Sequence, residues 1–286
     1  MRVEKFKLKE PSKLSDAIMK RYPFSYGKVM KMISKKDVKV NGKRVSKDQR
    51  VSEQDEIIFY YNEETISANV DIVYEDENIV IAFKPRQIEV ISDKGDDFLS
   101  QVKLKIDSTC YAVHRLDRNT IGLVIFAKNK ESKDILDKCF RNRTIDKNYL
   151  ALVYGKPKEN DDMVAYLKKD SEKSLVFVSD IAKDGYDRIE TRYKLINSFE
   201  NHSLVDVELV TGKTHQIRAH FAHIGCPIIG DEKYGYSDVN KEYKMKYQCL
   251  CAYKINFHFE NCLLDYLDGK TFELAKEKID FLKFCK

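Results

Sequence analysis

A ten-residue stretch, HRLDRNTIGL at positions 114–123, concentrates side chains that are suited to chemistry. His114, Arg115, Asp117 and Arg118 lie within five positions, and the chain then turns apolar. A carboxylate beside cations can act as a nucleophile or a base, because nearby positive charge favours its ionised form. An isolated Asp in such a setting more often caps a turn or pairs with its neighbours. The stretch alone therefore leaves open a charged turn, a nucleotide site and an activated carboxylate.

A second stretch, VELVTGKTH at 207–215, ends in the Gly-Lys-Thr of a phosphate-binding loop. The glycine expected five residues before Gly212 is Val207, and the intervening residues are not glycine-rich, so backbone amides could not cradle a phosphate there. A kinase is also excluded, because a Leu separates the Arg and Asp of HRLD and the chain has neither D-F-G nor G-x-G-x-x-G. A nucleotide-dependent transferase is thus the disfavoured rival among enzymes.

Four potential zinc ligands, His215, His220, His223 and Cys226, fall within twelve residues. The segment reads as an amphipathic helix whose histidines point to differing faces, and it contains no paired Cys/His knuckle. We therefore expect no metal. The seven cysteines are odd in number and include no C-x-x-C pair, which favours reduced thiols and a cytoplasmic protein. The chain also has no apolar run long enough for a membrane helix and no signal-like start.

The elements that must position these residues begin with a small basic unit. Helical spacing predicts helices at 12–22 and around 29–33, an alternating hairpin turns at Asn41-Gly42, and a strand closes the unit before a polar linker at 62–70. Residues 1–61 carry 16 Lys and Arg against 8 Asp and Glu, a net +8 that leaves the other 225 residues at −3. Clustered cations favour a polyanionic partner, although a Lys-rich solubilising surface is an equally ordinary reading.

The pattern of two helices followed by VKVNGKRV and a strand resembles the small S-four-like RNA-binding domain. The resemblance covers about 50 residues, so residues 1–61 are expected to form this domain. It implies that basic side chains on the helix pair and the hairpin contact folded RNA. These would be Lys28, Lys31, Lys35, Lys36, Lys43 and Arg44.

From residue 71 onward, strand-like runs alternate with charged helical stretches, which predicts an α+β fold built on a large mixed or antiparallel sheet. The expected catalytic domain spans 71–260. Residues 261–286 are expected to form a peripheral C-terminal segment, with a helix over 262–286. The absence of a fixed repeat or a low-complexity tract argues against a solenoid or a disordered tail.

Four ordered segments resemble the RluA-type family of pseudouridine synthases, which modify RNA. The family opens with a strand like VYEDENIVIAFKP (73–85), continues with H-R-L-D-x-x-T-S-G-L, and then has Lys-x-Tyr-Leu-Ala-Leu-Val and T-G-R-T-H-Q-I-R segments. The last three stand here as HRLDRNTIGL, KNYLALVYG (147–155) and TGKTHQIRAHFAHIGCPIIGDEKYG (211–235). The match runs across most of residues 71–236.

The resemblance implies a role for several residues. Asp117 matches the family's catalytic aspartate, which acts as a nucleophile or as a base toward the ribose, and Arg218 matches its cationic partner. Tyr149 matches the tyrosine that packs against the uracil and is a candidate for moving the carbon 5 proton. Arg115 matches the arginine that can fill the space left by a uridine turned out of an RNA helix. The isomerisation has no redox change or group donor, so no cofactor is implied.

Three departures from the family pattern stand near the site. Ile121 replaces the usual Ser of T-S-G-L, Lys213 replaces the Arg of T-G-R-T, and KPRQIEV replaces a typical Lys-Pro-Ala-Gly stretch. Lys213, an expected RNA contact, keeps the charge but loses bidentate geometry. The chain is thus expected to be a monomeric RNA-uridine isomerase acting on ribosomal RNA. The alternatives are a transfer RNA target and a catalytically silent RNA-binding protein.

Overall fold

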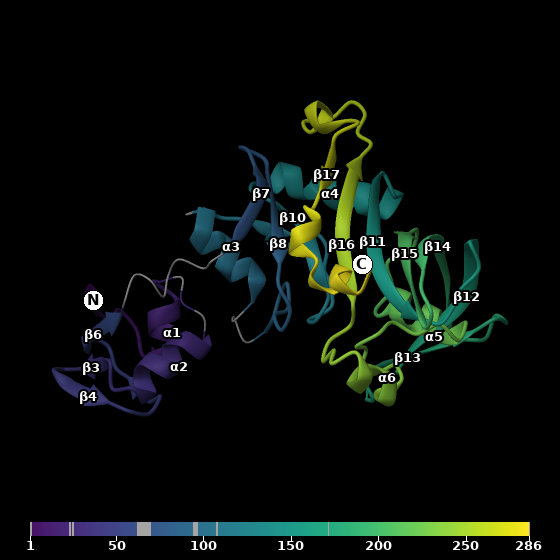
Figure 1. Ribbon diagram of the computed structural model, residues 1–286. Coiled ribbons are helices and arrows are strands. Elements are labelled where there is room, and N and C mark those ends of the chain that lie inside the picture. The colour runs from purple at the N-terminus through teal and green to yellow at the C-terminus, as the bar shows by residue number, and fades with distance from the viewer. Residues whose placement is uncertain are drawn as a thin grey trace. The chain divides into compact units, whose positions relative to one another are not determined.

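The computed structural model describes residues 2–22, 24, 26–61, 70–93, 97–106, 108–170 and 172–285 (Figure 1). The chain divides into two compact units: Met1–Asp71 with Ile88–Ala112, and Ile72–Gln87 with Val113–Lys286. The predicted linker lies outside the described residues except for Val70. The domain boundaries at 61 and 71 stay predictions, and the grouping of residues 88–112 with the first unit was not suggested by the sequence.

The first unit contains a small antiparallel sheet and two short helices. Its elements before the linker are β1 (Arg2–Lys7), β2 (Ser12–Lys13), α1 (Leu14–Met19), α2 (Tyr26–Ser34), β3 (Val38–Val40), β4 (Lys43–Val45), β5 (Arg50–Val51) and β6 (Glu56–Tyr61). The four-stranded sheet has the order β1-β6-β3-β4. Asn41 and Gly42 have φ angles of 49° and 78°, the left-handed pair that a two-residue hairpin turn requires. The hairpin and both helices are therefore confirmed, but the first helix is shorter than the predicted 12–22, because Ser12–Lys13 form β2 and the helix ends at Met19.

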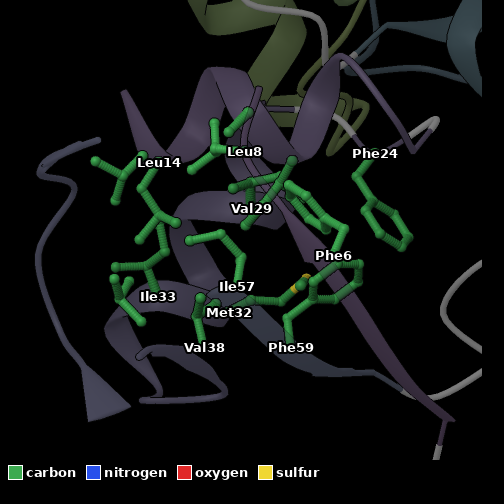
Figure 2. Packing of buried hydrophobic residues seen from close by; sticks show 14 of the residues in the cluster. Phe6, Leu8, Leu14, Phe24, Val29, Met32, Ile33, Val38, Ile57 and Phe59 are labelled. Atoms are coloured by element: carbon green, nitrogen blue, oxygen red, sulfur yellow. The ribbon is translucent and has the colours of Figure 1, made fainter. Parts of the chain in front are cut away.

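The core of this unit forms between the helices and one face of its sheet (Figure 2). Leu14 of α1, together with Val29 and Ile33 of α2, is fully buried. Ile57 and Phe59 of β6 point into the same core because side chains two apart share one face of a strand. Burying a side chain of this size stabilises the fold by about 1.5–3 kcal/mol. The S-four-like identity of the unit stays a prediction.

The unit also contains α3 (Phe98–Ile106) and β9 (Tyr111–Ala112).

The second unit is built on a large sheet in the order β13-β12-β14-β15-β11-β16-β10-β8-β7, with β17 beside β16 (Figure 1). β10 and β16 run parallel, and the other strand pairs along this order with a described register are antiparallel. The predicted α+β class with a large mixed sheet is confirmed. The elements of the unit are β7 (Asp71–Glu75), β8 (Ile79–Lys84), β10 (Ile121–Ala127), α4 (Lys130–Asn142), β11 (Ile145–Tyr154), β12 (Asn160–Asp170), β13 (Leu175–Ser179), β14 (Asp187–Ser198), β15 (His202–Leu209), α5 (Gln216–His223), α6 (Ser237–Glu242), β16 (Leu250–Phe257), η2 (Asp265–Leu267), β17 (Thr271–Glu273), η3 (Lys276–Lys278) and η4 (Asp280–Cys285).

The apolar run after Asp117 is strand β10, and every one of its residues is buried. Gly122 has a φ angle of 132°, and a Cβ added there would lie 2.3 Å from the carbonyl oxygen of Ala252 in β16. Only glycine permits this close approach. The sequence therefore brings the start of β10, and the loop that carries Asp117, against the middle of the sheet.

The predicted helix over 262–286 is wrong. The described part of this segment contains three short 3₁₀ helices and strand β17, which pairs with β16. Leu264, Leu267 and Phe281 are fully buried. The segment consists of short turns and a strand beside β16, so its apolar residues reach the core without a continuous helical face.

The membrane-spanning potential and the cysteines were also assessed from the sequence. In the described residues, no helix has the length and apolar character that crossing a bilayer demands. All seven cysteines are free thiols.

Candidate active site

Asp117 and Arg218, a hundred residues apart in the chain, are in direct contact. Asp117 lies in the loop before β10, and Arg218 lies in α5. The Nη1 of Arg218 donates a hydrogen bond of 2.9 Å to Oδ2 of Asp117. The Asp117 side chain is 20% exposed, so one edge of the carboxylate stays open to a ligand. A cation at this distance favours the ionised carboxylate.

Asp231 holds the other edge of the Arg218 guanidinium and was missed from the sequence. Nε and Nη2 of Arg218 donate to its two oxygens at 2.6 and 2.9 Å. Asp231 is fully buried and also accepts hydrogen bonds from the backbone N–H groups of Lys233 and Tyr234. Burial by itself lowers the pKa of Arg218, but the hydrogen bonds and charges of Asp231 and Asp117 outweigh burial and raise it. Asp231 lies in GDEKYG, at the end of the segment that resembles the family. Its position in this segment was the sequence signal that could have identified it.

A buried lysine anchors the loop that carries Asp117. Lys84 ends β8 with a fully buried side chain. Its Nζ donates to the carbonyl oxygens of Pro85 and Arg118, at 2.8 and 3.1 Å. The second contact joins the end of β8 to the residue after Asp117, which limits the positions that the carboxylate can take.

Tyr149 faces the same cavity from β11, the strand between β15 and β16. Its side chain is buried, and the pairing of β11 with β16 is irregular between Asn148 and Tyr149. Burial first, and then the negative charge of Asp117, raise the pKa of the Tyr149 phenol. The phenol therefore keeps its proton at neutral pH and can exchange one only with a group held against it.

Asp117, Tyr149 and Arg218 line one cavity of about 860 Å³. This volume lies within the range of small-molecule sites. Apolar parts of the wall come from Leu116, Phe140, Ile145, Val210 and Leu250. The arrangement of one carboxylate held by an arginine, one neutral phenol and apolar walls suits a planar, uncharged ring that must be shielded from water.

Of the predicted RNA contacts, Arg115 and Lys213 also line this cavity. Arg115 is exposed, whereas the Nζ of Lys213 lies 2.8 Å from Oδ2 of Asp187. Buried Gln216 fixes the Lys213 backbone: its Oε1 accepts hydrogen bonds from the Lys213 N–H and the Thr211 hydroxyl. Its Nε2 donates to the carbonyl oxygen of Glu190 in β14. The segment after β15 is thereby tied to the sheet.

The three histidines weighed as zinc ligands have separate partners. The rings of His215, His220 and His223 are hydrogen-bonded to Tyr234, Thr191 and Asp180 respectively. Within the described ranges, no three His, Cys, Asp or Glu side chains are grouped so as to hold a metal ion. His215 Nε2 lies 4.0 Å from Asp117 Oδ2. Burial lowers the pKa of His215 to about 4, so this ring is neutral at pH 7.

The predicted RNA-binding residues of the first unit cover its helix α2 and the β3–β4 hairpin. Lys31, Lys35, Lys36, Lys43 and Arg44 are exposed. Lys28 is half-buried, and burial lowers its pKa. The Nη1 of Arg44 donates to the carbonyl oxygen of Lys36, which joins the hairpin to the end of α2. We refer to these six side chains as the basic group of this unit.

Known proteins are similar to this chain in sequence and in fold. The sequence model described as RNA pseudouridylate synthase matches residues 78–223. A protein of Mycoplasma capricolum named uncharacterized RNA pseudouridine synthase is 34% identical over 268 residues, covering 85% of this chain and 86% of its own. Ribosomal large subunit pseudouridine synthase C of Rickettsia bellii is 32% identical over 255 residues, covering 78% and 83%. The human structure titled RNA Pseudouridylate Synthase Domain Containing 1 superposes with a TM-score of 0.58 at 20% identity, over 77% of this chain and 96% of that one.

The family match and the curated relatives therefore place this protein among the RNA-modifying isomerases. The chain belongs to the RNA pseudouridylate synthase family, as its four sequence segments predicted, and it is an RNA pseudouridine synthase.

Proposed function

We propose that this enzyme converts uridines of large-subunit ribosomal RNA to pseudouridine, with Asp117 as the reacting carboxylate. The observation that carries the proposal is the Asp117 carboxylate, held by Arg218 and open to the cavity that Tyr149 lines. The ribosomal target is supported by the name of the Rickettsia bellii relative.

The reaction needs one bond to break and another to form. The glycosidic bond between C1′ and N1 breaks, the uracil rotates, and C5 bonds to C1′ while C5 loses a proton and N1 gains one. Asp117 starts this sequence either by attacking the nucleoside or by removing a ribose proton, and both roles need the ionised form that Arg218 favours. Tyr149 packs against the uracil, and its hydroxyl is the candidate carrier of the C5 proton. Uridine and pseudouridine are isomers, so no cofactor enters the balance.

The target base must leave its stack to reach Asp117. Extrusion costs a few kcal/mol and is least costly in loops and at mismatches. The exposed position of Arg115 beside the cavity supports its proposed role of filling the space that the base leaves. The detached uracil is then retained by the apolar wall of the cavity.

The test is to incubate the protein with unmodified large-subunit ribosomal RNA and, separately, with unmodified transfer RNA, and to map pseudouridine chemically. We expect new pseudouridine at discrete positions of the ribosomal RNA. Modification of transfer RNA alone would show that transfer RNA, and not ribosomal RNA, is the substrate. No pseudouridine in either RNA would refute the proposed activity.

The basic group of the first unit is proposed to hold RNA by its phosphates. We expect the triple variant Lys31→Gln/Lys35→Gln/Lys43→Gln to reduce the slope of log K against log salt concentration by about 2–3. With fewer phosphate contacts, RNA binding releases fewer counterions. Filter binding to the ribosomal RNA transcript over a salt series measures the slope. The control removes the same charge from the exposed lysines 241, 244 and 246. Equal slopes for the two variants would contradict the role.

A further inference from the structure

Apart from Arg218, which pairs with Asp117 and Asp231, the cations around the active-site cavity fall into two sets. Arg192 is paired with Glu190 at 3.0 Å and with Glu208 at 3.3 Å, and Lys213 is paired with Asp187. A second set, which we call the open cations, consists of Arg115, Arg141, Arg143 and Lys147. Within the described residues, no side chain of this set forms an ion pair or a hydrogen bond. Positive charge is therefore neutralised by carboxylates on one part of the cavity wall and not on another.

Sheet topology places most of the two sets on opposite sides of β11. Arg192 belongs to β14 and its partner Glu208 to β15, and both strands lie on one side of β11 in the sheet (Figure 1). Arg141 and Arg143 come from the end of α4, which packs on β10, beyond β16 on the other side of β11. The rim of the cavity formed by β14 and β15 therefore carries paired cations, whereas the rim formed by the end of α4 carries open cations.

The backbone holds Arg141 and Arg143 in place. Arg143 ends α4 in the left-handed conformation, with a φ angle of 60°, and its N–H donates to the carbonyl oxygen of Cys139. The Thr144 N–H donates to the same oxygen at 3.0 Å. Arg141 lies in the last turn, where the negative end of the helix dipole favours a cation. Both arginines therefore extend from a rigid helix end into the cavity wall.

Lys147 is the open cation that lies near Tyr149 in the cavity wall. It lies two residues before Tyr149 on β11, so both side chains point to the same face of the strand, and both line the cavity. Its Nζ is 5.1 Å from the centre of the Phe140 ring. A phosphate is the ligand that matches a desolvated ammonium without a carboxylate partner, because the pair neutralises both charges.

We propose that three of the open cations, Arg141, Arg143 and Lys147, bind the phosphates on either side of the target uridine, so that the RNA strand enters the cavity along the end of α4 rather than across β14 and β15. This inference rests on the proposed function for the identity of the RNA. On the opposite rim, carboxylates such as Glu190 and Glu208 neutralise the neighbouring cations, so that rim attracts a phosphate backbone less than the α4 side does.

The test compares two double variants that each lose two positive charges. Arg141→Gln/Arg143→Asn removes open cations, and Asn is chosen because it tolerates the left-handed conformation at position 143. Arg188→Gln/Arg192→Gln removes cations that are already paired with Glu190. Affinity for an unmodified large-subunit ribosomal RNA transcript is measured over a salt series, with the free energy of unfolding checked for each variant. If the double variant fails to fold, Arg141→Gln alone replaces it.

We expect the first variant to reduce the salt slope by about 2, or by about 1 for Arg141→Gln alone, and the second to change it by less than about 0.5. Equal reductions would overturn the proposal, as would an unchanged slope for the first variant or no RNA binding by the unaltered protein. Binding does not require turnover. An RNA that is bound with the expected slopes but never modified would therefore refute the proposed function and leave the strand path standing.

Lys147 allows a separate measurement of the same path. Burial lowers its pKa to about 8, so the ammonium loses its proton, and with it the phosphate contact, as the pH rises through 8. Affinity for the transcript is therefore expected to fall between about pH 7 and 9. Of the titratable groups around it, His114 is neutral in this range because burial lowers its pKa to about 3, and the raised pKa keeps Tyr149 neutral.

The matched variant is Lys147→Arg, which stays charged at all these pH values. It is expected to show a flatter pH dependence, while Lys147→Met binds weakly throughout. Asp117, which Arg218 holds, is common to all three proteins. The same pH dependence in the unaltered protein and in Lys147→Arg would remove Lys147 from the path.

Discussion

Replacement of Asp117 by Asn is expected to reduce pseudouridine formation by at least about 10³-fold while the protein still folds and binds RNA. The amide has nearly the size of the carboxylate and can still accept the hydrogen bond from Arg218. It cannot attack the nucleoside or remove a proton, because it carries no negative charge. Single-turnover formation of pseudouridine in the ribosomal RNA transcript measures the loss.

A second carboxylate in the cavity wall supplies the control. Asp146 lines the same cavity, and His258 Nε2 lies 2.7 Å from its Oδ2. Asp146→Asn is expected to retain activity within about tenfold, since its carboxylate faces that partner at a more exposed position. Full activity in Asp117→Asn would contradict the proposed chemistry. A large loss in Asp146→Asn with an unaltered Asp117 would assign the reaction to the other carboxylate.

Asp231→Asn is expected to lower the free energy of unfolding by about 3–5 kcal/mol, because it leaves the buried Arg218 guanidinium without its fully buried counter-charge. The backbone N–H groups of Lys233 and Tyr234 would also lose a charged acceptor. Denaturant unfolding followed by circular dichroism measures the change. The turnover rate under conditions where the variant is folded should also fall, because Arg218 would no longer be held toward Asp117.

The neighbouring residue gives a matched comparison. Glu232 is exposed, and Glu232→Gln removes the same charge one position along the chain. We expect it to change the free energy of unfolding by less than about 0.5 kcal/mol. Similar stabilities for the two variants would show that the Arg218–Asp231 pair is not the structural anchor of the site.

Local pattern was sufficient for much of the fold. The buried run after Asp117 became β10, the charged stretch at 130–142 became α4, and the alternation around Asn41-Gly42 became a hairpin. In each case the period of the apolar residues and a turn signal act over a few positions, so neighbouring residues decide the outcome. The predicted helix over 262–286 was wrong because the buried residues of this segment are set by its short turns and by the pairing of β17 with β16, which no local period encodes.

The sequence by itself determined the family and the identity of the candidate residues, since Asp117, Tyr149 and Arg218 stand in segments whose order and spacing are readable along the chain. Only the tertiary structure decided which charges are neutralised. Asp231 secures Arg218, and Asp187 pairs with Lys213, while Arg141, Arg143 and Lys147 meet no carboxylate among the described residues. Ion pairing depends on distances of a few ångströms between residues far apart in the chain, and these distances exist only once the strands have assembled.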